Sequence, residues 1–110
     1  GGSVVKEEQS TDHEAFRLGS ILGELSEVIR RRKAELPEGS YTTYLFQKGL
    51  DKILKKVGEE AAEVIIGAKN RDREEVIYEV SDLIYHLLVL LAEQEISLGE
   101  IAGELASRRK

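Results

Sequence analysis

The stretch Gly58-Glu59-Glu60-Ala61-Ala62-Glu63-Val64 decides how this chain is organised. It holds three carboxylates within five residues, and the acidic pair Glu79 and Asp82 follows at the same three-residue offset as Glu60 and Glu63. Residues i and i+3 are neighbours on a helix surface, so each pair offers two carboxylates side by side. Two such helices packed together would bring four carboxylates into one site, an arrangement suited to hard divalent cations.

Apolar residues recur at helical spacing through most of the chain, and no strand pattern competes with them. The periodicity predicts long helices over about residues 11–33, 50–69 and 73–93, and a last helix after Ser97. A short helical segment over residues 41–47 fits between the first two. The fold class is therefore predicted to be all-α, with four main helices.

The start of the chain is predicted to lie outside the folded domain. Gly1-Gly2-Ser3 lacks an initiator methionine and resembles the remnant of a cleaved tag, and residues 4–10 are polar and without period. We expect residues 1–10 to form a flexible N-terminal tail and residues 11–110 to form a single domain. Thr11 with Glu14 has the form of a capping box, so the first helix is expected to begin near Thr11.

The composition narrows the classes of function. The absence of cysteine excludes a disulfide framework and any thiolate metal site. A net charge of -5 argues against a protein held mainly by nucleic-acid phosphates. No apolar run reaches the ~20 residues of a membrane span, and no signal-peptide pattern opens the chain. We therefore expect a cytoplasmic protein that binds neither nucleic acid nor a membrane.

The carboxylates of the helix over residues 50–69 project beside its apolar stripe. At ~100° per residue, Lys56, Glu60 and Glu63 fall within one sector about 60° wide. Glu59 points further round the helix, away from the core. Gly67 continues the polar sector, and its missing side chain predicts room for a ligand.

The next helix repeats this pattern. Glu79, Asp82, Glu75 and His86 share one sector about 60° wide, with apolar residues on both sides of it. The far side carries a second apolar stripe, formed by Tyr78, Tyr85, Val89 and Ala92. A helix that is apolar nearly all round is buried. One stripe then packs within the subunit, and a second copy of the chain is the simplest partner for the other, which predicts a homodimer.

The residues alone leave two interpretations of the carboxylates. A structural ion-pair network is one, because Lys56 lies one turn before Glu60. A metal site is the other, since buried like charges are very costly unless they are paired or bind metal. Oxygen ligands favour Mg²⁺, Mn²⁺ or Ca²⁺ over zinc. The chain has no Glu-x-x-His, which argues against a di-iron site, and His86 is expected to be a hydrogen-bonded core histidine.

A group of lysines precedes the acidic stretch. Lys52 and Lys56 lie one turn apart on the carboxylate side, and Lys48 comes just before them. Carboxylate-bound Mg²⁺ keeps positions for substrate phosphates, and phosphate chemistry needs nearby cations to neutralise charge. We therefore expect these three lysines to bind a phosphorylated substrate. Lys55 is expected to be an ordinary surface lysine.

These motifs resemble a known family. Glu60-x-x-Glu63 followed by Glu79-x-x-Asp82 resembles the MazG-type all-α nucleoside triphosphate pyrophosphohydrolases. Three longer stretches are similar to the phosphoribosyl-ATP pyrophosphohydrolases of histidine biosynthesis, and they cover residues 38–42, 48–61 and 82–91. The resemblance extends from about residue 14 to residue 109.

The resemblance implies a four-helix MazG-like bundle completed by dimerisation, and an Mg²⁺-dependent enzyme. The implied reaction converts phosphoribosyl-ATP and water to phosphoribosyl-AMP and pyrophosphate, by metal-assisted attack on the α/β phosphate linkage. The implied metal ligands are Glu60, Glu63, Glu79 and Asp82. Glu59 or Glu60 would orient the water, and Mn²⁺ is the alternative ion. Some members are fused to a cyclohydrolase with cysteine metal ligands, so none is expected within this cysteine-free chain.

Two alternatives stay open at this point. One is a general MazG-type pyrophosphohydrolase of (d)NTPs. The other is a non-catalytic helical dimerisation module whose carboxylates form buried ion pairs. Pyrophosphate release from phosphoribosyl-ATP, measured beside a panel of NTPs, separates these possibilities.

Overall fold

The computed structural model describes the backbone of residues 2–109 and the side chains of residues 13–109. Its helices are α1 (Gly2–Glu35), α2 (Tyr41–Lys48), α3 (Leu50–Lys69), α4 (Arg73–Glu93) and α5 (Leu98–Ser107). The described residues contain no strand, which confirms the all-α class. None of the described helices combines the length and hydropathy needed to cross a bilayer.

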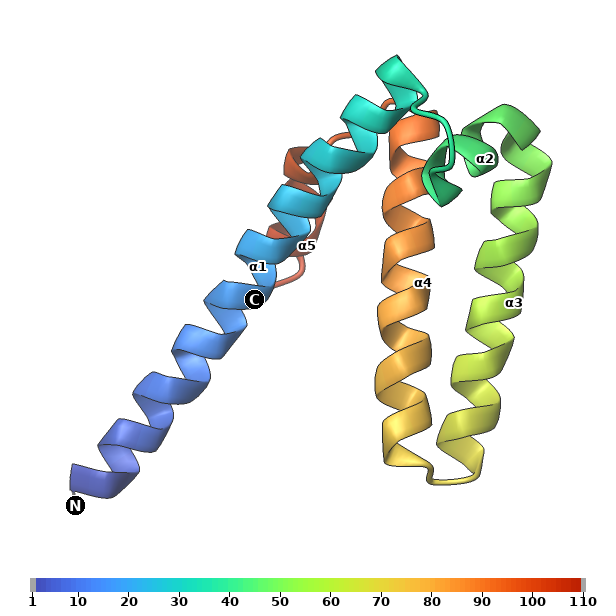
Figure 1. The fold of residues 1–110 in the computed structure, drawn as a ribbon. Coiled ribbons are helices and arrows are strands. Elements are labelled where there is room, and N and C mark those ends of the chain that lie inside the picture. The colour runs from blue at the N-terminus through green and yellow to red at the C-terminus, as the bar shows by residue number, and fades with distance from the viewer. Residues whose placement is uncertain (1, 110) are drawn as a thin grey trace.

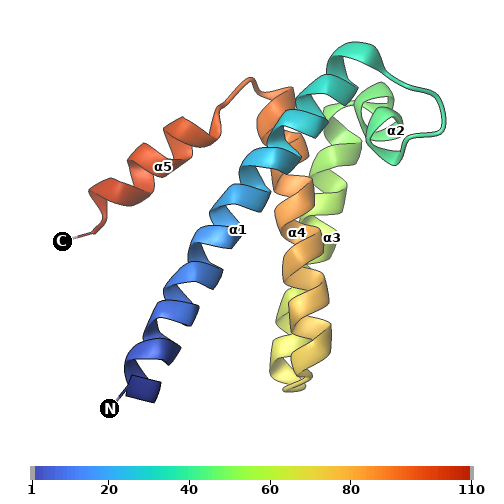
Figure 2. The same ribbon diagram turned by 60° about the vertical axis from the view of Figure 1, so that its left-hand side comes forward.

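The α3–α4 hairpin is the centre of the molecule. Figure 1 shows α3 and α4 running antiparallel, with α2 at their upper end and α1 crossing there. Figure 2, turned by 60°, shows α1 and α5 leaving that end in different directions. The hairpin therefore presents most of its length without cover from the other helices.

Local capping explains where most helices begin. Ser40 begins α2 and Asp72 begins α4, because each side chain accepts a backbone N–H three residues further on. Ser97 and Glu100 form a complete capping box at the start of α5. Such caps satisfy amides that have no partner within the helix. The predicted bounds of α3 and α4 are both confirmed.

Helix α1 is longer than predicted. It begins at Gly2, so Thr11 and Glu14 lie inside the helix, and the prediction that it begins near Thr11 is wrong. No proline or glycine separates residues 4–10 from the periodic part, so nothing in the sequence stops the helix there. Gly1 and the side chains of residues 2–12 lie outside the described part, and the flexible tail stays a prediction.

A tight turn joins α3 to α4. Asn70 is the C-cap of α3, and Arg71 follows with φ of 54°. The Arg71 N–H donates to the Ala68 carbonyl at 3.1 Å, and the Asp72 N–H donates to the Gly67 carbonyl at 3.0 Å. These are the two bonds of a Schellman motif. Arg71 thus occupies the left-handed position that glycine usually takes.

Gly67 allows α4 to approach α3 beside this turn. A Cβ atom at this position would lie 3.2 Å from Cγ of Glu75 and 3.4 Å from Cγ2 of Val76. The prediction that Gly67 leaves room for a ligand is therefore wrong, because α4 fills that space.

The core lies at the end of the hairpin away from the turn. Its buried apolar side chains come from α1, α2, α3 and α4, and they are Ile29, Leu45, Ile53, Leu88, Val89 and Ala92. A hydrogen bond between the hydroxyls of Thr42 and Tyr85 also joins α2 to α4. Most of the apolar packing is thus concentrated where α1 and α2 meet α4.

The turn end of the hairpin carries apolar side chains on its surface. Ile65 and Ile66 of α3 and Ile77 and Tyr78 of α4 are all more than half exposed. In α1, Phe16 is 79% exposed. The predicted second stripe of α4 is thus only partly exposed, because Val89 and Ala92 are buried in the core of the subunit and Tyr78 is exposed. Coverage of this surface by a second copy stays a prediction.

Candidate metal centre

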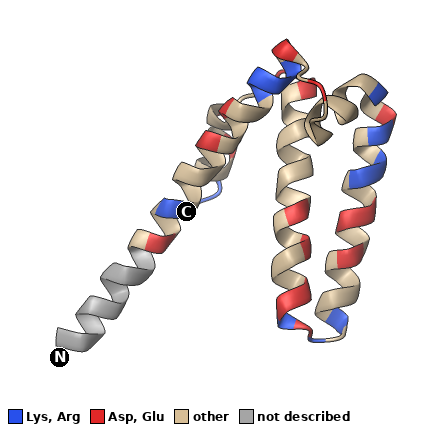
Figure 3. Ribbon diagram, in the orientation of Figure 1, with Lys and Arg blue, Asp and Glu red and all other residues tan. Residues whose placement is uncertain are grey.

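A groove between α3 and α4 is lined by all four predicted metal ligands. It has a volume of about 420 Å³, and its lining comprises Lys56, Glu59, Glu60, Glu63, Tyr78, Glu79 and Asp82. Figure 3 shows acidic residues on the facing helices, with the lysines nearer the upper end of α3. Five of these side chains are acidic and one is basic, so the groove is strongly negative.

The carboxylates form two clusters, and each cluster combines residues from both helices. Glu60 and Asp82 meet at His86, while Glu63 and Glu79 meet at Glu75. Within each cluster, one candidate ligand atom per residue lies within 4.8 Å of the others. The two carboxylate pairs predicted from their spacing, one on each helix, thus face each other.

Two of these carboxylates are buried without full compensation. Glu60 is 5% exposed and Glu79 is 7% exposed. In the described structure, Oε1 of each accepts no hydrogen bond. A buried carboxylate oxygen without a partner carries a large desolvation cost. The ion pair with Lys56 compensates Glu60 in part, and a divalent cation between α3 and α4 would compensate both groups.

The pKa of Glu79 reflects this crowding. Burial, a hydrogen bond with the Glu75 carboxyl and the charges of Glu75, Glu63 and Glu60 raise the pKa of Glu79 to about 7. Among the described side chains, no Lys, Arg or His forms an ion pair with Glu63, Glu75 or Glu79. An ion-pair network therefore accounts for Glu60 but not for the cluster around Glu79. The donor set, all oxygen and rich in charge, fits Mg²⁺ or Mn²⁺.

Lys56 is the lysine that the structure brings to the carboxylates. Its Nζ lies 3.5 Å from Glu60 Oε1 and 3.9 Å from Glu59 Oε1. Burial lowers the pKa of Lys56, but Tyr41 and Glu60 raise it by more, so the net direction is upward. Lys56 therefore stays charged and partly neutralises the mouth of the groove.

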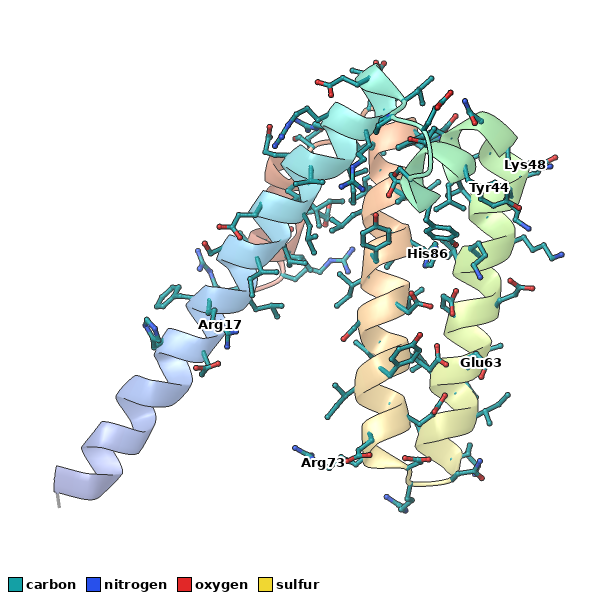
Figure 4. The ribbon with its side chains drawn as sticks, in the orientation of Figure 1. Arg17, Tyr44, Lys48, Glu63, Arg73 and His86 are labelled. Atoms are coloured by element: carbon teal, nitrogen blue, oxygen red, sulfur yellow. The ribbon has the colours of Figure 1, made fainter. Side chains whose placement is uncertain are left out.

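Lys48 and Lys52 lie elsewhere. Their Nζ atoms are 5.9 Å and 5.8 Å from the ring centroid of Tyr44, on α2. Figure 4 shows Tyr44 and Lys48 above His86, with Glu63 further down the hairpin. Neither lysine lines the acidic groove.

His86 is a hydrogen-bonded core histidine, as predicted. Its Nδ1 lies 2.8 Å from the carbonyl oxygen of Asp82, and its Nε2 lies 2.8 Å from the hydroxyl of Tyr41. A carbonyl only accepts, so Nδ1 carries the proton and, in the neutral ring, Nε2 accepts from Tyr41. The Nδ1–H also points toward Glu60 and Asp82, whose carboxylate oxygens are each 3.7 Å away. His86 therefore supports the carboxylates rather than offering a free ligand atom.

Glu59 lines the groove, and Glu75 belongs to one of its two carboxylate clusters. The Glu59 side chain is 51% exposed, in agreement with its predicted outward direction. Glu75 was not among the four predicted ligands, although its helical position places it in the same sector as Glu79. The structure adds it to the cluster with Glu63 and Glu79.

Comparison with known proteins gives a consistent result. A sequence profile of the phosphoribosyl-ATP pyrophosphohydrolases matches residues 22–109. The chain is 65% identical over 88 residues to a phosphoribosyl-ATP pyrophosphatase of Listeria monocytogenes, covering 80% of this chain and 84% of that protein. It is 56% identical over 91 residues to the protein of the same name from Clostridium botulinum, covering 83% of each.

Bifunctional relatives match over only part of their length. The histidine biosynthesis bifunctional protein HisIE of Bacillus subtilis is 58% identical over 106 residues. That alignment covers 96% of this chain and 50% of the bifunctional protein. The chain thus spans about half the length of this relative.

Proposed function

Because the chain belongs to the phosphoribosyl-ATP pyrophosphohydrolase family, we propose that it hydrolyses phosphoribosyl-ATP to phosphoribosyl-AMP and pyrophosphate, as a step of histidine biosynthesis. One observation carries the proposal. The groove between α3 and α4 gathers the carboxylates of two helices, and among the described residues the buried Oε1 of Glu79 has neither a hydrogen bond nor an ion pair. This is the environment that a divalent cation requires.

Four carboxylates would hold the cation or cations, namely Glu60, Glu63, Glu79 and Asp82, with Glu75 beside them. A bound Mg²⁺ or Mn²⁺ would supply Lewis acidity to the triphosphate and activate the attacking water. Lys56, at the mouth of the groove, would neutralise negative charge on the phosphates as pyrophosphate departs.

Glu59 is suited to accept the proton of the water. It lines the groove, its side chain is half-exposed, and it belongs to neither carboxylate cluster. In the proposed step, the water oxygen forms a bond to the α-phosphorus. The bond from that phosphorus to the α/β bridging oxygen breaks, and pyrophosphate leaves with the electron pair. Glu60, buried and ion-paired with Lys56, is better suited to holding a cation.

We also propose that the chain works as a homodimer in the cytoplasm. The exposed apolar side chains at the turn end of the hairpin support self-association, because isolated chains rarely leave such a surface in water. Dimerisation would cover the part of α3 and α4 that α1 does not reach (Figure 1).

A pyrophosphate-release assay tests the proposed reaction. Purified protein with Mg²⁺ should release pyrophosphate from phosphoribosyl-ATP much faster than from ATP or any dNTP. A preference for ordinary dNTPs would replace the proposal with a general nucleotide pyrophosphohydrolase. No release from any nucleotide, with Mg²⁺ or Mn²⁺, would leave the non-catalytic dimerisation module.

Matched variants test the carboxylates. Glu63→Gln and Asp82→Asn keep the shape of each side chain and remove its charge, so both should lose at least a hundredfold in kcat/KM. Glu74→Gln, on an exposed position of α4 outside both clusters, should keep the parental rate. Parental rates in all three variants would refute the assignment of the groove as the active site.

A further inference from the structure

A pair of tyrosines on α2 forms an exposed aromatic platform beside the groove. The rings of Tyr41 and Tyr44 stack with centroids 6.1 Å apart and planes 27° apart, and both side chains are exposed. They line a hollow of about 530 Å³ between α2 and the loop before it. Exposed aromatic faces of this kind bind nucleobases by stacking.

The ammonium groups of Lys48 and Lys52 both lie close to the ring of Tyr44. The Nζ atoms of Lys48 and Lys52 are both within 6 Å of the Tyr44 centroid. Among the described side chains, neither lysine forms an ion pair with a carboxylate, whereas Lys56 pairs with two. Two like charges at one ring repel each other, and an anion bound between them would remove that repulsion.

A chain of polar contacts through the buried His86 joins the platform to the carboxylates of the groove. Tyr41 donates to Nε2 of His86, whose other nitrogen faces Glu60 and Asp82. Along α3, Lys52, Lys56 and Glu60 follow at intervals of four residues on one face. Helix rise places Lys52 roughly 12 Å from Glu60 along the axis. A ligand that reaches from these lysines to a cation held at Glu60 must therefore carry negative charge at two separated positions.

We propose that Lys48 and Lys52 bind a second phosphoryl group of the substrate, distant from its triphosphate. Tyr44 stacks on the base, which lies between this phosphoryl group and the triphosphate. This inference rests on the proposed function, because phosphoribosyl-ATP carries a phosphorylated ribose on its adenine as well as the triphosphate. ATP has the triphosphate and base but not the second phosphoryl group. The lysines thus select the larger nucleotide, and Lys56 alone serves the phosphates in the groove.

Product binding separates this role from catalysis. Calorimetric titration with phosphoribosyl-AMP and with AMP, both with Mg²⁺ present, compares ligands that differ only in the phosphoribosyl group. The double variant Lys48→Met/Lys52→Met should bind phosphoribosyl-AMP at least tenfold more weakly and AMP within about twofold of the parent. Tyr44→Leu should weaken both ligands by similar factors. Lys55→Met, an exposed lysine of the same helix, should change neither.

The outcomes distinguish the two proposals. If the parent releases no pyrophosphate from phosphoribosyl-ATP, the proposed function fails. If the parent is active and the double variant, folded by circular dichroism, keeps the parental affinity for phosphoribosyl-AMP, only the second-phosphate site fails. An equal loss of affinity for both ligands would also overturn it, because the lysines would then contact the part that the ligands share.

Discussion

The pKa of Glu79 predicts how cation binding depends on pH. In the metal-free chain its pKa lies at about 7, because burial, the Glu75 hydrogen bond and the surrounding carboxylates favour the neutral form. A cation needs the carboxylate, so binding must release this proton. The apparent affinity should therefore fall by up to tenfold for each pH unit below 7 and level off above it. Between pH 8 and pH 5.5 the expected loss is about 30-fold.

The raised pKa of Glu79 also determines whether the metal-free chain becomes more or less stable as pH rises. Between the ordinary pKa of 4.5 and the folded value of about 7, the folded state binds more protons than the unfolded state. The free energy of unfolding should therefore decrease as pH rises through this window, and Glu79 contributes its full destabilisation above pH 7. Added Mg²⁺ should restore stability most at the alkaline end.

Isothermal titration with Mn²⁺ or Mg²⁺ between pH 5.5 and 8.5 measures the affinity. Repeating it in buffers of different ionisation enthalpy gives the number of protons released. Glu79→Gln should bind the cation more weakly and lose the part of the pH dependence below 7 that Glu79 supplies. Metal affinity in the parent that stays flat from pH 5.5 to 7, or a slope that Glu79→Gln leaves unchanged, would refute this reasoning.

Three further predictions concern stability and assembly. Arg71→Gly should raise the free energy of unfolding by up to about 1 kcal/mol in urea titration, because glycine adopts the left-handed conformation of Arg71 without steric cost. Lys33→Met should lower the free energy of unfolding by about 1 kcal/mol, because Lys33 Nζ donates to the Ala92 carbonyl at 2.9 Å near the end of α4. An unchanged free energy of unfolding would show that water replaces this bond. Ile65→Asp, at a position 64% exposed in the single chain, should leave a folded monomer in sedimentation analysis, and an unchanged dimer would place the interface elsewhere.

Helix positions were predictable because their signals are local. Asp72 and Ser97 cap the helices that follow them, and Asn70 ends α3, all within one turn of the residues concerned. The start of α1 was missed for the same reason. Thr11 and Glu14 have the spacing of a capping box, but that spacing also fits the interior of a helix that continues on both sides.

The facing of the two carboxylate clusters depends on the register between helices. Glu60 and Asp82 lie eleven residues on either side of Arg71, and Glu63 and Glu79 lie eight residues on either side. A tight turn centred on Arg71 therefore sets each pair at the same level of an antiparallel hairpin. Helical periodicity gives the sector of each side chain, but only the length of the turn gives its partner. The equal spacing is visible in the sequence once the turn is known.

The positions of Lys48 and Lys52 could not be obtained from periodicity. Lys52 shares a helix face with Lys56 and Glu60, which indicated a role at the carboxylates. The deciding contact is with Tyr44, and α2 brings that ring to the lysines because the chain turns at Gly49, with φ of 95°. The folding back of α2 is a tertiary effect. The separation of Lys56 from Lys48 and Lys52 therefore appears only in the structure.

The two halves of the hairpin differ in stability: the upper half, away from the turn, is well packed, and the lower half, which contains the turn, is not. The upper half is held by buried apolar side chains and by hydrogen bonds from α2, including the one from Tyr41 to His86. The lower half holds the acidic cluster of Glu63, Glu75 and Glu79, and its surface is apolar. Charge repulsion within this half and exposure of its apolar surface both oppose order in an isolated, metal-free chain. Cation binding and self-association would each remove one of these costs, so metal affinity and dimer stability should rise together.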